Sequence, residues 1–258
     1  MKPFAALAQD AGPQAPGDGM MESPCPDQKG LWFGHAYVKQ NDWPWLCRFQ
    51  ADNARRAATG APDVVFIGDS ITEGWERTDP AFFGKTRANR GISGQTSPQM
   101  LLRFWQDVVA LKPRAVHIMA GTNDVAGNTG PISAETYRNN IRAMVALARA
   151  NGIAVILGSI LPADRFGWKP KARPASQIAE LNAWLRTFAQ DEGLAYADYY
   201  AAMVAPGGGL QDGLSKDSVH PEPAGYERMR PIAEAAIRQA LASHAAAGAR
   251  RAGHRHKP

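Results

Sequence analysis

The stretch that decides the fold is residues 62–75, PDVVFIGDSITEGW. Four apolar residues, 64–67, run without a polar break and stop at Gly68-Asp69-Ser70, a pattern that predicts a buried strand ending in a serine. Ligands of an open parallel sheet bind beyond the carboxyl ends of its strands, so a substrate is expected at Ser70. Gly-Asp-Ser alone is also a common turn sequence, and the functional interpretation therefore depends on the residues downstream.

The rest of the chain alternates between segments with strand character and segments with helical periodicity. After the first strand we expect a short helix or loop at 79–85, and strands at 86–89, 115–120, 153–159 and 194–198. Helices are expected within 45–56 and at 98–111, 134–150, 175–192 and 223–244. Strands that alternate with helices imply a parallel sheet covered on both faces. The predicted fold class is α/β, a three-layer α/β/α sandwich with a five-stranded parallel sheet.

Composition and charge favour a globular domain and give no indication of a nucleic-acid partner. With 258 residues, 45% of them hydrophobic and 21% charged, the chain can bury one sizeable core. The formal net charge is +5, and the residues after Ala242 contribute +4 of it. We therefore predict a leader at 1–30, a single domain at 31–242 and a basic disordered tail at 243–258. No apolar run in the sequence is long enough to span a bilayer.

The N-terminal residues favour an exported protein, periplasmic or secreted, with the cytoplasm as the alternative. Residues 3–10, PFAALAQD, are similar to the end of a secretory signal, with Ala6-Leu7-Ala8 as the small-residue cleavage site. Only two cysteines occur, Cys25 and Cys47. They would pair in an exported protein, whereas two unpaired thiols in the cytosol are equally compatible with their number. Export favours the disulfide.

Polar residues gather where the predicted strands end and in the loop before the last helix. These residues are Ser70 after the first strand, Ser93 and Gly94 after the second, Asn123 after the third, and Asp217 with His220 in the loop. The carboxyl ends of parallel strands meet at one edge of the sheet, so we expect the set to lie together.

This set of side chains is suited to acyl transfer. A serine hydroxyl becomes a useful nucleophile when an imidazole takes its proton, and the imidazole needs a carboxylate to fix its tautomer. His220 and Asp217, three residues apart on one loop, can serve Ser70 in this way. The oxyanion formed in the reaction needs donors, and the backbone N–H groups of Ser70 and Gly94 with the Asn123 amide would supply three.

At these residues the chain resembles the SGNH hydrolases, also called GDSL esterases, whose four sequence blocks occur here in order. The blocks are Gly68-Asp69-Ser70, the turn ending at Gly94, Gly121-x-Asn123-Asp124 and Asp217-x-x-His220, and the resemblance covers about residues 62–230. It implies a flavodoxin-like fold, no cofactor and no metal, Ser70 as nucleophile, His220 as base, Asp217 as its orienter, and Gly94 and Asn123 as oxyanion donors. The second block, Gly-Ile-Ser-Gly-Gln-Thr, is most similar to the branch of platelet-activating-factor acetylhydrolases and bacterial carbohydrate acetylesterases. The first block reads GDSIT rather than GDSL, at a position that packs rather than reacts.

Each of these residues also has a plainer interpretation. Asn123 could belong to an ordinary strand-to-helix turn, and His220 could be a helix-entry residue. Asp212 is a rival to Asp217, although the three-residue spacing to the histidine favours Asp217. Asp69 is expected to hold its turn by accepting backbone hydrogen bonds rather than to act as an acid. Four such blocks in the expected order favour the functional interpretation of all of them.

Other classes of protein fit the sequence less well. The glycine-bearing turn lacks the Gly-Lys-Ser/Thr ending of a phosphate-binding loop. The first block lacks the second glycine of the α/β-hydrolase nucleophile elbow, and the six histidines form no metal-ligand pattern. A non-catalytic module that binds a glycan or another partner is the alternative outside enzymes, because a fold does not guarantee activity.

The sequence predicts a serine esterase for short acyl groups, with acetyl esters of carbohydrates as the first choice of substrate. Four residues, Trp75, Arg165, Phe166 and Trp168, are candidates to line an open, polar-rimmed cleft, although aromatic residues of this kind also pack in cores. A lysophospholipase or arylesterase of the same family is the alternative. The oligomeric state is left open.

Overall fold

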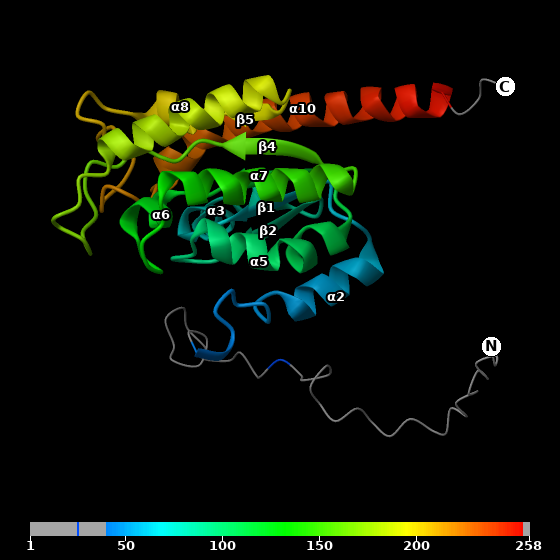
Figure 1. Cartoon of the computed structure of the whole chain (residues 1–258), viewed down its shortest axis with the longest axis horizontal. Coiled ribbons are helices and arrows are strands. Elements are labelled where there is room, and N and C mark those ends of the chain that lie inside the picture. The colour runs from blue at the N-terminus through cyan, green and yellow to red at the C-terminus, as the bar shows by residue number, and fades with distance from the viewer. Residues whose placement is uncertain (1–24, 26–39, 255–258) are drawn as a thin grey trace, which may run out of the picture.

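The computed structural model describes Cys25 and residues 40–254 of the chain. At its centre lies an all-parallel five-stranded sheet in the order β2-β1-β3-β4-β5 (Figure 1). The strands are β1 (Val64–Gly68), β2 (Arg87–Gly91), β3 (Ala115–Met119), β4 (Ala154–Gly158) and β5 (Ala195–Ala197). This arrangement confirms the predicted α/β fold with five parallel strands.

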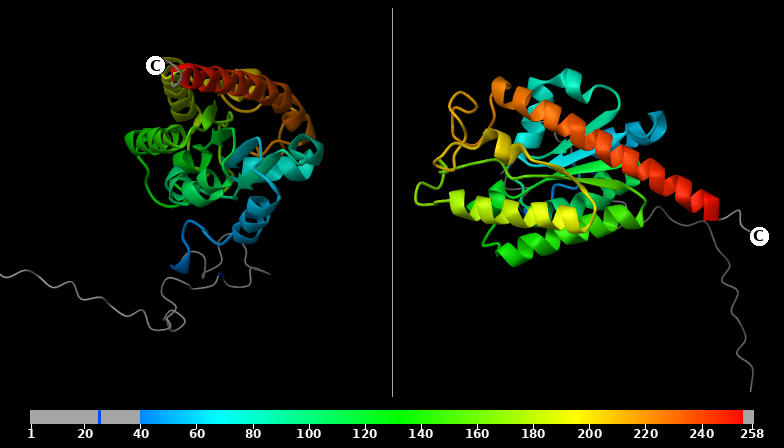
Figure 2. Two further views of the ribbon diagram at one scale, coloured as in Figure 1. Left: turned by 90° about the vertical axis from the view of Figure 1, so that its right-hand side faces the viewer. Right: turned by 90° about the horizontal axis from the view of Figure 1, so that it is seen from above.

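Helices cover both faces of the sheet (Figures 1 and 2). The first face carries α5 (Ser97–Asp107), α7 (Ala134–Ala150) and α8 (Ala175–Asp191), and the second α3 (Ser70–Thr78), α4 (Pro80–Phe83), α9 (Tyr199–Met203) and α10 (Pro223–His254). Successive residues of β1 alternate between the two apolar clusters, Val65 and Ile67 toward the first and Val64 and Phe66 toward the second. This alternation explains why residues 64–67 form an unbroken apolar run, because both faces of the strand are buried.

The remaining helices are α2 (Gln50–Thr59), the 3-10 helix η1 (Val109–Leu111) and α6 (Thr122–Ala126). Most boundaries lie within two residues of the sequence predictions, and α7 matches them at both ends. Two short helices, α6 and α9, and the helix α3 that begins at Ser70 were not predicted. They are five, five and nine residues long, which is too short for a clear helical period in the sequence.

The C-terminal helix is longer than predicted. It continues to His254, ten residues beyond His244, where the sequence analysis ends the helix. Three consecutive alanines, 245–247, provide strong helix formers at the point where the sequence analysis ended the helix. The predicted leader lies outside the described residues, except for Cys25, as does the remainder of the tail.

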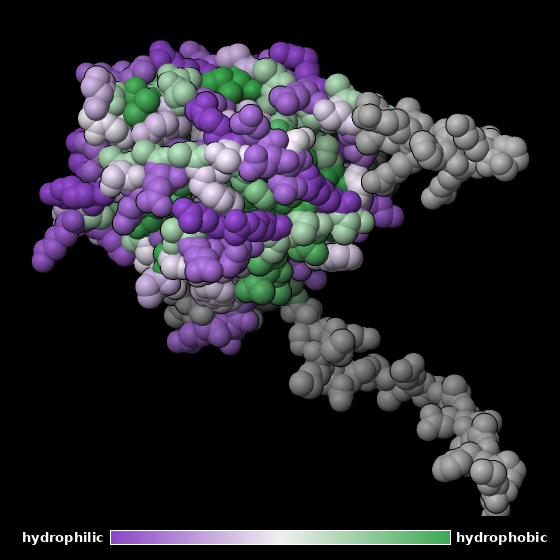
Figure 3. All heavy atoms as spheres, turned by 45° about the horizontal axis from the view of Figure 1, so that its top comes forward, coloured by the Kyte–Doolittle hydropathy of each residue, from purple (hydrophilic) through white to green (hydrophobic). Residues whose placement is uncertain are grey.

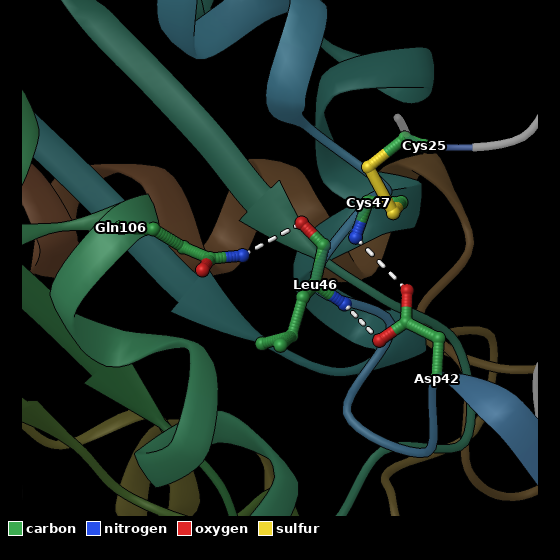
Figure 4. Close-up of a disulfide and its surroundings, with 5 residues drawn as sticks. All are labelled: Cys25, Asp42, Leu46, Cys47 and Gln106. Carbon is green, nitrogen blue, oxygen red and sulfur yellow. Dashed lines mark hydrogen bonds between the residues drawn. A yellow bond between two sulfur atoms is a disulfide. The ribbon is translucent and has the colours of Figure 1, made fainter. Parts of the chain in front are cut away.

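Cys25 and Cys47 form a disulfide (Figure 4). The Asp42 carboxylate accepts the backbone N–H groups of Leu46 and Cys47 at 2.6 and 3.0 Å, and the Gln106 side chain of α5 donates to the Leu46 carbonyl at 2.6 Å. The turn that bears Cys47 is therefore fixed against the first face of the domain.

On the face drawn in Figure 3, hydrophilic residues are interspersed with small groups of hydrophobic ones. Among the described residues, no helix combines the length and the apolar character needed to cross a bilayer.

Candidate active site

Ser70 stands at the junction of β1 and α3, where it is the first residue of the helix. Asp69 caps the helix, because its carboxylate accepts the Ile71 backbone N–H at 3.0 Å. The Asp69 side chain is buried, and burial raises its pKa to about 6 although the Ile71 hydrogen bond acts in the opposite direction. Asp69 therefore stabilises the turn that presents Ser70, in line with the sequence prediction.

The loop before α10 brings His220 to this serine. The Ser70 Oγ and His220 Nε2 atoms lie 2.8 Å apart, although the residues are 150 positions apart in the sequence. On the other side of the ring, His220 Nδ1 lies 2.6 Å from Asp217 Oδ2. Serine, imidazole and carboxylate thus form one continuous hydrogen-bonded chain, with the side chains of His220 and Asp217 40% and 52% exposed.

Local backbone hydrogen bonds hold Asp217 in this position. Its Oδ1 atom accepts the backbone N–H groups of Val219 and His220 at 2.9 and 2.7 Å and the Ser215 hydroxyl at 3.1 Å. Partial burial would raise the pKa of Asp217, but the hydrogen bonds from His220 and Val219 outweigh it and lower the pKa to about 2. The carboxylate that faces the His220 imidazole is that of Asp217. The structure records no contact between Asp212 and this imidazole.

Gly94 lies in a tight turn between β2 and α5. The Gln95 backbone N–H donates to the Ile92 carbonyl at 3.2 Å, and Gly94 occupies the third position of this turn with φ 77°. That backbone conformation favours glycine. Glu73 of α3 fixes the turn by accepting the Ser93 backbone N–H at 3.0 Å and the Ser93 hydroxyl.

Asn123, the second residue of α6, joins the first three sequence blocks. Its Nδ2 atom donates to the Gln95 carbonyl at 3.0 Å and to Asp69 Oδ2 at 3.2 Å, and the side chain is buried. The amide N–H groups therefore lie between the turn that bears Gly94 and the turn that bears Ser70. A side-chain amide in this position can donate a hydrogen bond to a group bound between the two turns.

A buried arginine that the sequence analysis missed holds the turns that bear Ser70 and Gly94 by hydrogen bonds. Arg103 of α5 donates to the carbonyls of Gly68 and Arg90, at 3.1 and 2.8 Å, and to the Gln95 side chain at 2.6 Å. It pairs with Asp107 at 3.0 Å, and both side chains are fully buried. The charged pair one turn apart on the apolar face of a predicted helix was the only signal in the sequence.

Two candidate substrate contacts are corrected by the structure. Trp75 is fully buried in the second cluster, stacked on Phe82 and on Tyr226 with ring centroids 4.8 and 5.7 Å apart. Phe166 is 1% exposed and packs into the first cluster. Both rings are core residues, because α4, α10 and the helices of the first face supply apolar partners that a sequence window does not display.

The other two candidates are exposed. Arg165 pairs with Asp164 at 3.2 Å and lines a hollow of about 660 Å³ whose lining includes none of Ser70, Asp217 and His220. Trp168 is 45% exposed, and its indole N–H donates to Asn128 Oδ1 at 2.9 Å. Within the part of the chain that the structure describes, no group of three or more His, Cys, Asp or Glu residues could hold a metal ion.

Comparison with known families identifies the arrangement. Residues 66–228 match the GDSL-like lipase/acylhydrolase family. The chain belongs to this family. The match spans all four blocks and confirms the predicted SGNH, or GDSL, hydrolase family.

A solved GDSL-like lipase from Bacteroides thetaiotaomicron is 42% identical, with a TM-score of 0.73, and the match covers 77% of this chain and 100% of that one. An acetylxylan esterase of Xylanibacter ruminicola is 26% identical over 81% of this chain and 49% of its own length. The uncharacterized lipoprotein YqeF of Bacillus subtilis is 34% identical over 40% of this chain and 50% of its own length. The chain thus spans about half the length of the curated relatives that it matches.

Proposed function

We propose that this GDSL family member hydrolyses acetyl esters of carbohydrates with Ser70, His220 and Asp217 as a catalytic triad. The observation that carries the proposal is the unbroken sequence of contacts from the Ser70 hydroxyl through both nitrogens of His220 to the Asp217 carboxylate. A carboxylate that is hydrogen-bonded by two backbone N–H groups stays ionised and can stabilise the imidazolium that forms during the reaction.

In the first half of the reaction, Ser70 Oγ attacks the acyl carbon while His220 Nε2 takes the hydroxyl proton. The oxyanion of the tetrahedral intermediate accepts hydrogen bonds from the Ser70 and Gly94 backbone N–H groups and from Asn123 Nδ2. His220 then returns the proton to the sugar oxygen, which leaves as an alcohol. In the second half, His220 activates a water that hydrolyses the acyl-serine and frees the acid.

Two features support a carbohydrate leaving group. The triad is open to solvent, with His220 and Asp217 side chains 40% and 52% exposed, which leaves room for a bulky, hydrated alcohol. Trp168 presents an exposed aromatic ring beside the loop that follows Asn123, and aromatic rings of this kind suit the apolar faces of sugars. The relative that acts on acetylxylan agrees with this choice.

The proposed location is outside the cytoplasm. The Cys25–Cys47 disulfide supports it, because disulfides persist mainly in oxidising compartments. A lipoprotein among the relatives is compatible with the same assignment.

Hydrolysis of p-nitrophenyl esters from acetate to a long-chain acyl group, together with acetate release from acetylated xylo-oligosaccharides, tests the proposal. We expect activity that falls steeply beyond acetate and disappears in Ser70→Ala. A preference for long acyl chains would reassign the protein as a lipid esterase, and fast hydrolysis of aryl acetates without acetate release from sugars as an arylesterase. Full activity in Ser70→Ala would contradict the mechanism, and no activity on any ester would favour a binding module.

A further inference from the structure

Asn128 folds back onto Asn123 because of the way α6 ends. Gly127 follows the helix with φ 62°, and its backbone N–H donates to the Asp124 carbonyl at 2.9 Å. The Asn128 backbone N–H donates to the Asn123 carbonyl at 3.1 Å. These two bonds form a Schellman motif, which brings the second residue after the helix next to the residue five positions earlier. Here that pair is Asn128 and Asn123, and the Asn128 Nδ2 atom donates to Asn123 Oδ1 at 2.6 Å.

Trp168 determines which way the Asn128 amide faces. An indole N–H can only donate, so the atom of Asn128 that lies 2.9 Å from Trp168 Nε1 must be the oxygen. The amide nitrogen of Asn128 is then directed at Asn123 and can only donate. Asn123 in turn must present its oxygen to Asn128 and its two N–H groups to the site. One donor at Trp168 thus orders two amides in succession.

Trp168 is itself held by its surroundings. Its ring stacks on the buried Phe166, with centroids 5.1 Å apart and planes at 23°. A short turn closes this loop, because the Lys169 backbone N–H donates to the Phe166 carbonyl at 2.9 Å. The Lys169 ammonium also donates to the Gly127 carbonyl at 3.1 Å. The connection between β4 and α8 is therefore fastened to the end of α6 at two points.

The two N–H groups of Asn123 are used unequally. One donates to the Gln95 carbonyl at 3.0 Å, and the other to Asp69 Oδ2 at 3.2 Å. An incoming oxyanion would take over the longer bond to Asp69, while the bond to Gln95 and the one accepted from Asn128 keep the amide in its plane. Hydrogen bonds in such a series also strengthen one another, so Asn123 becomes a better donor when its oxygen accepts.

We propose that Asn128 and Trp168 are positioning residues of the oxyanion hole. They orient the Asn123 amide through a relay of two hydrogen bonds, from the Trp168 N–H to Asn128 and from Asn128 to Asn123. This inference rests on the proposed function, in which Asn123 is an oxyanion donor. It assigns Trp168 a role in turnover that does not depend on any contact with the substrate.

The first test uses Asn128→Leu and Trp168→Phe with p-nitrophenyl acetate, a substrate whose leaving group is not a sugar. Trp168→Phe keeps an aromatic ring that can stack on Phe166 and removes the N–H donor. We expect kcat to fall about 5- to 30-fold in each variant, a part of the roughly 10²–10³-fold loss for removing an oxyanion donor. KM should change less than about twofold, because positioning of this donor matters mainly in the transition state.

Matched controls separate positioning from general damage. Asn151→Leu removes an exposed asparagine that follows α7 and donates to the Leu147 carbonyl, and Trp105→Phe alters a tryptophan that is 58% exposed on α5. Both controls should keep wild-type kcat. Tm is recorded beside kcat for every variant, and we expect Asn128→Leu to lower Tm more than Asn151→Leu, because it removes the hydrogen bond to the buried Asn123 Oδ1.

The decisive measurement combines each substitution with Asn123→Ala. If Asn128 and Trp168 act through Asn123, their substitution in the Asn123→Ala background should lower kcat less than about twofold further. Losses that multiply in the double variants, or no loss in the single variants, would overturn the relay. Ester hydrolysis that persisted in Ser70→Ala would instead count against the proposed function.

A readout that needs no activity completes the test. The side-chain amide resonances of Asn123 in 15N–1H NMR spectra should shift in Asn128→Leu and in Trp168→Phe. They should not move in Asn151→Leu or Trp105→Phe. Unchanged Asn123 resonances in the first two variants would contradict the relay even if the protein hydrolysed none of the esters.

Discussion

The Asp217 carboxylate holds His220 by two separate bonds, one to the ring and one to the backbone. Oδ2 lies 2.6 Å from His220 Nδ1, and Oδ1 accepts the His220 backbone N–H at 2.7 Å. The same carboxylate therefore fixes both the position of the residue and the orientation of its ring. The three-residue spacing between the two permits this double contact.

Replacement of Asp217 tests this relationship. Asp217→Asn should lower kcat by about 10⁴-fold, because an amide can hold the wrong imidazole tautomer and cannot stabilise the imidazolium. Asp212→Asn is the matched control on the same loop and should keep wild-type kcat. Steady-state kinetics on p-nitrophenyl acetate measure both. A large loss in Asp212→Asn with little effect of Asp217→Asn would exchange the two roles.

Replacement of Asn123 tests the third oxyanion donor. Asn123→Ala should lower kcat by about 10²–10³-fold with little change in KM, because the lost hydrogen bond forms fully only in the transition state. Asn140→Ala provides a control, since Asn140 donates to the Ser97 hydroxyl at 3.0 Å on the far side of Asp124. An unaltered kcat in Asn123→Ala would remove this residue from the oxyanion hole.

Gly91 is needed because α3 approaches the end of β2 closely. A Cβ atom at Gly91 would lie 2.2 Å from the Glu73 backbone nitrogen and 2.7 Å from the Thr72 carbonyl carbon. Gly91→Ala must therefore displace the helix that begins at Ser70. We expect it to lower the free energy of unfolding by about 1–3 kcal/mol and to reduce kcat. Urea titrations measure the first effect, and Gly207→Ala, where a Cβ meets nothing within 4 Å, should be neutral.

Burial of Asp124 makes stability depend on pH between about 4 and 6. Burial raises its pKa to about 6 from 3.8, while hydrogen bonds from Ser97 oppose the shift. In this interval the folded protein keeps a proton that the unfolded chain releases, so this group lowers the free energy of unfolding as pH rises. Asp69 acts in the same direction, with a pKa of about 6. The folded-state pKa of Asp217, about 2, lies below this interval, so its own contribution is lost only at more acidic pH.

Asp124→Asn removes one of these groups and keeps an oxygen that can accept from Ser97. The free energy of unfolding of this variant, measured by urea titration at pH 4, 5 and 6, should fall less with pH than that of the wild type. The difference in slope can reach about 1.4 kcal/mol per pH unit. Identical slopes in the two proteins would mean that Asp124 does not hold its proton in the folded state.

The Cys25–Cys47 disulfide should contribute about 2–4 kcal/mol to the free energy of unfolding, since it closes a loop between residues 22 positions apart. Denaturant titrations of the wild type with and without a reductant measure the contribution. The double variant Cys25→Ser/Cys47→Ser should resemble the reduced wild type and be insensitive to the reductant. A reductant that destabilised the double variant equally would show that the effect does not come from this bond.

The order of the strands along the chain and the residues at their ends could be read from the sequence. Residues 64–67 form an apolar run because both faces of β1 are buried, and such runs are visible in a short window. The polar residues that follow the strands, Ser70 and Asn123 among them, must meet at one edge because all five strands are parallel. The pairing of Asp217 with His220 could also be predicted, because the two residues are only three positions apart on one loop.

The surroundings of these residues were decided by the tertiary structure. Trp75 is a core residue because Tyr226, 151 positions later, stacks on it, and Arg103 could be recognised only when Gly68, Arg90 and Gln95 were in place around it. Trp168 reaches Asn123 only through Asn128, across a contact between two loops 40 residues apart. Sequence patterns record which side chains are apolar or reactive along one segment. Burial and hydrogen-bond partners depend on segments that meet only in the folded chain.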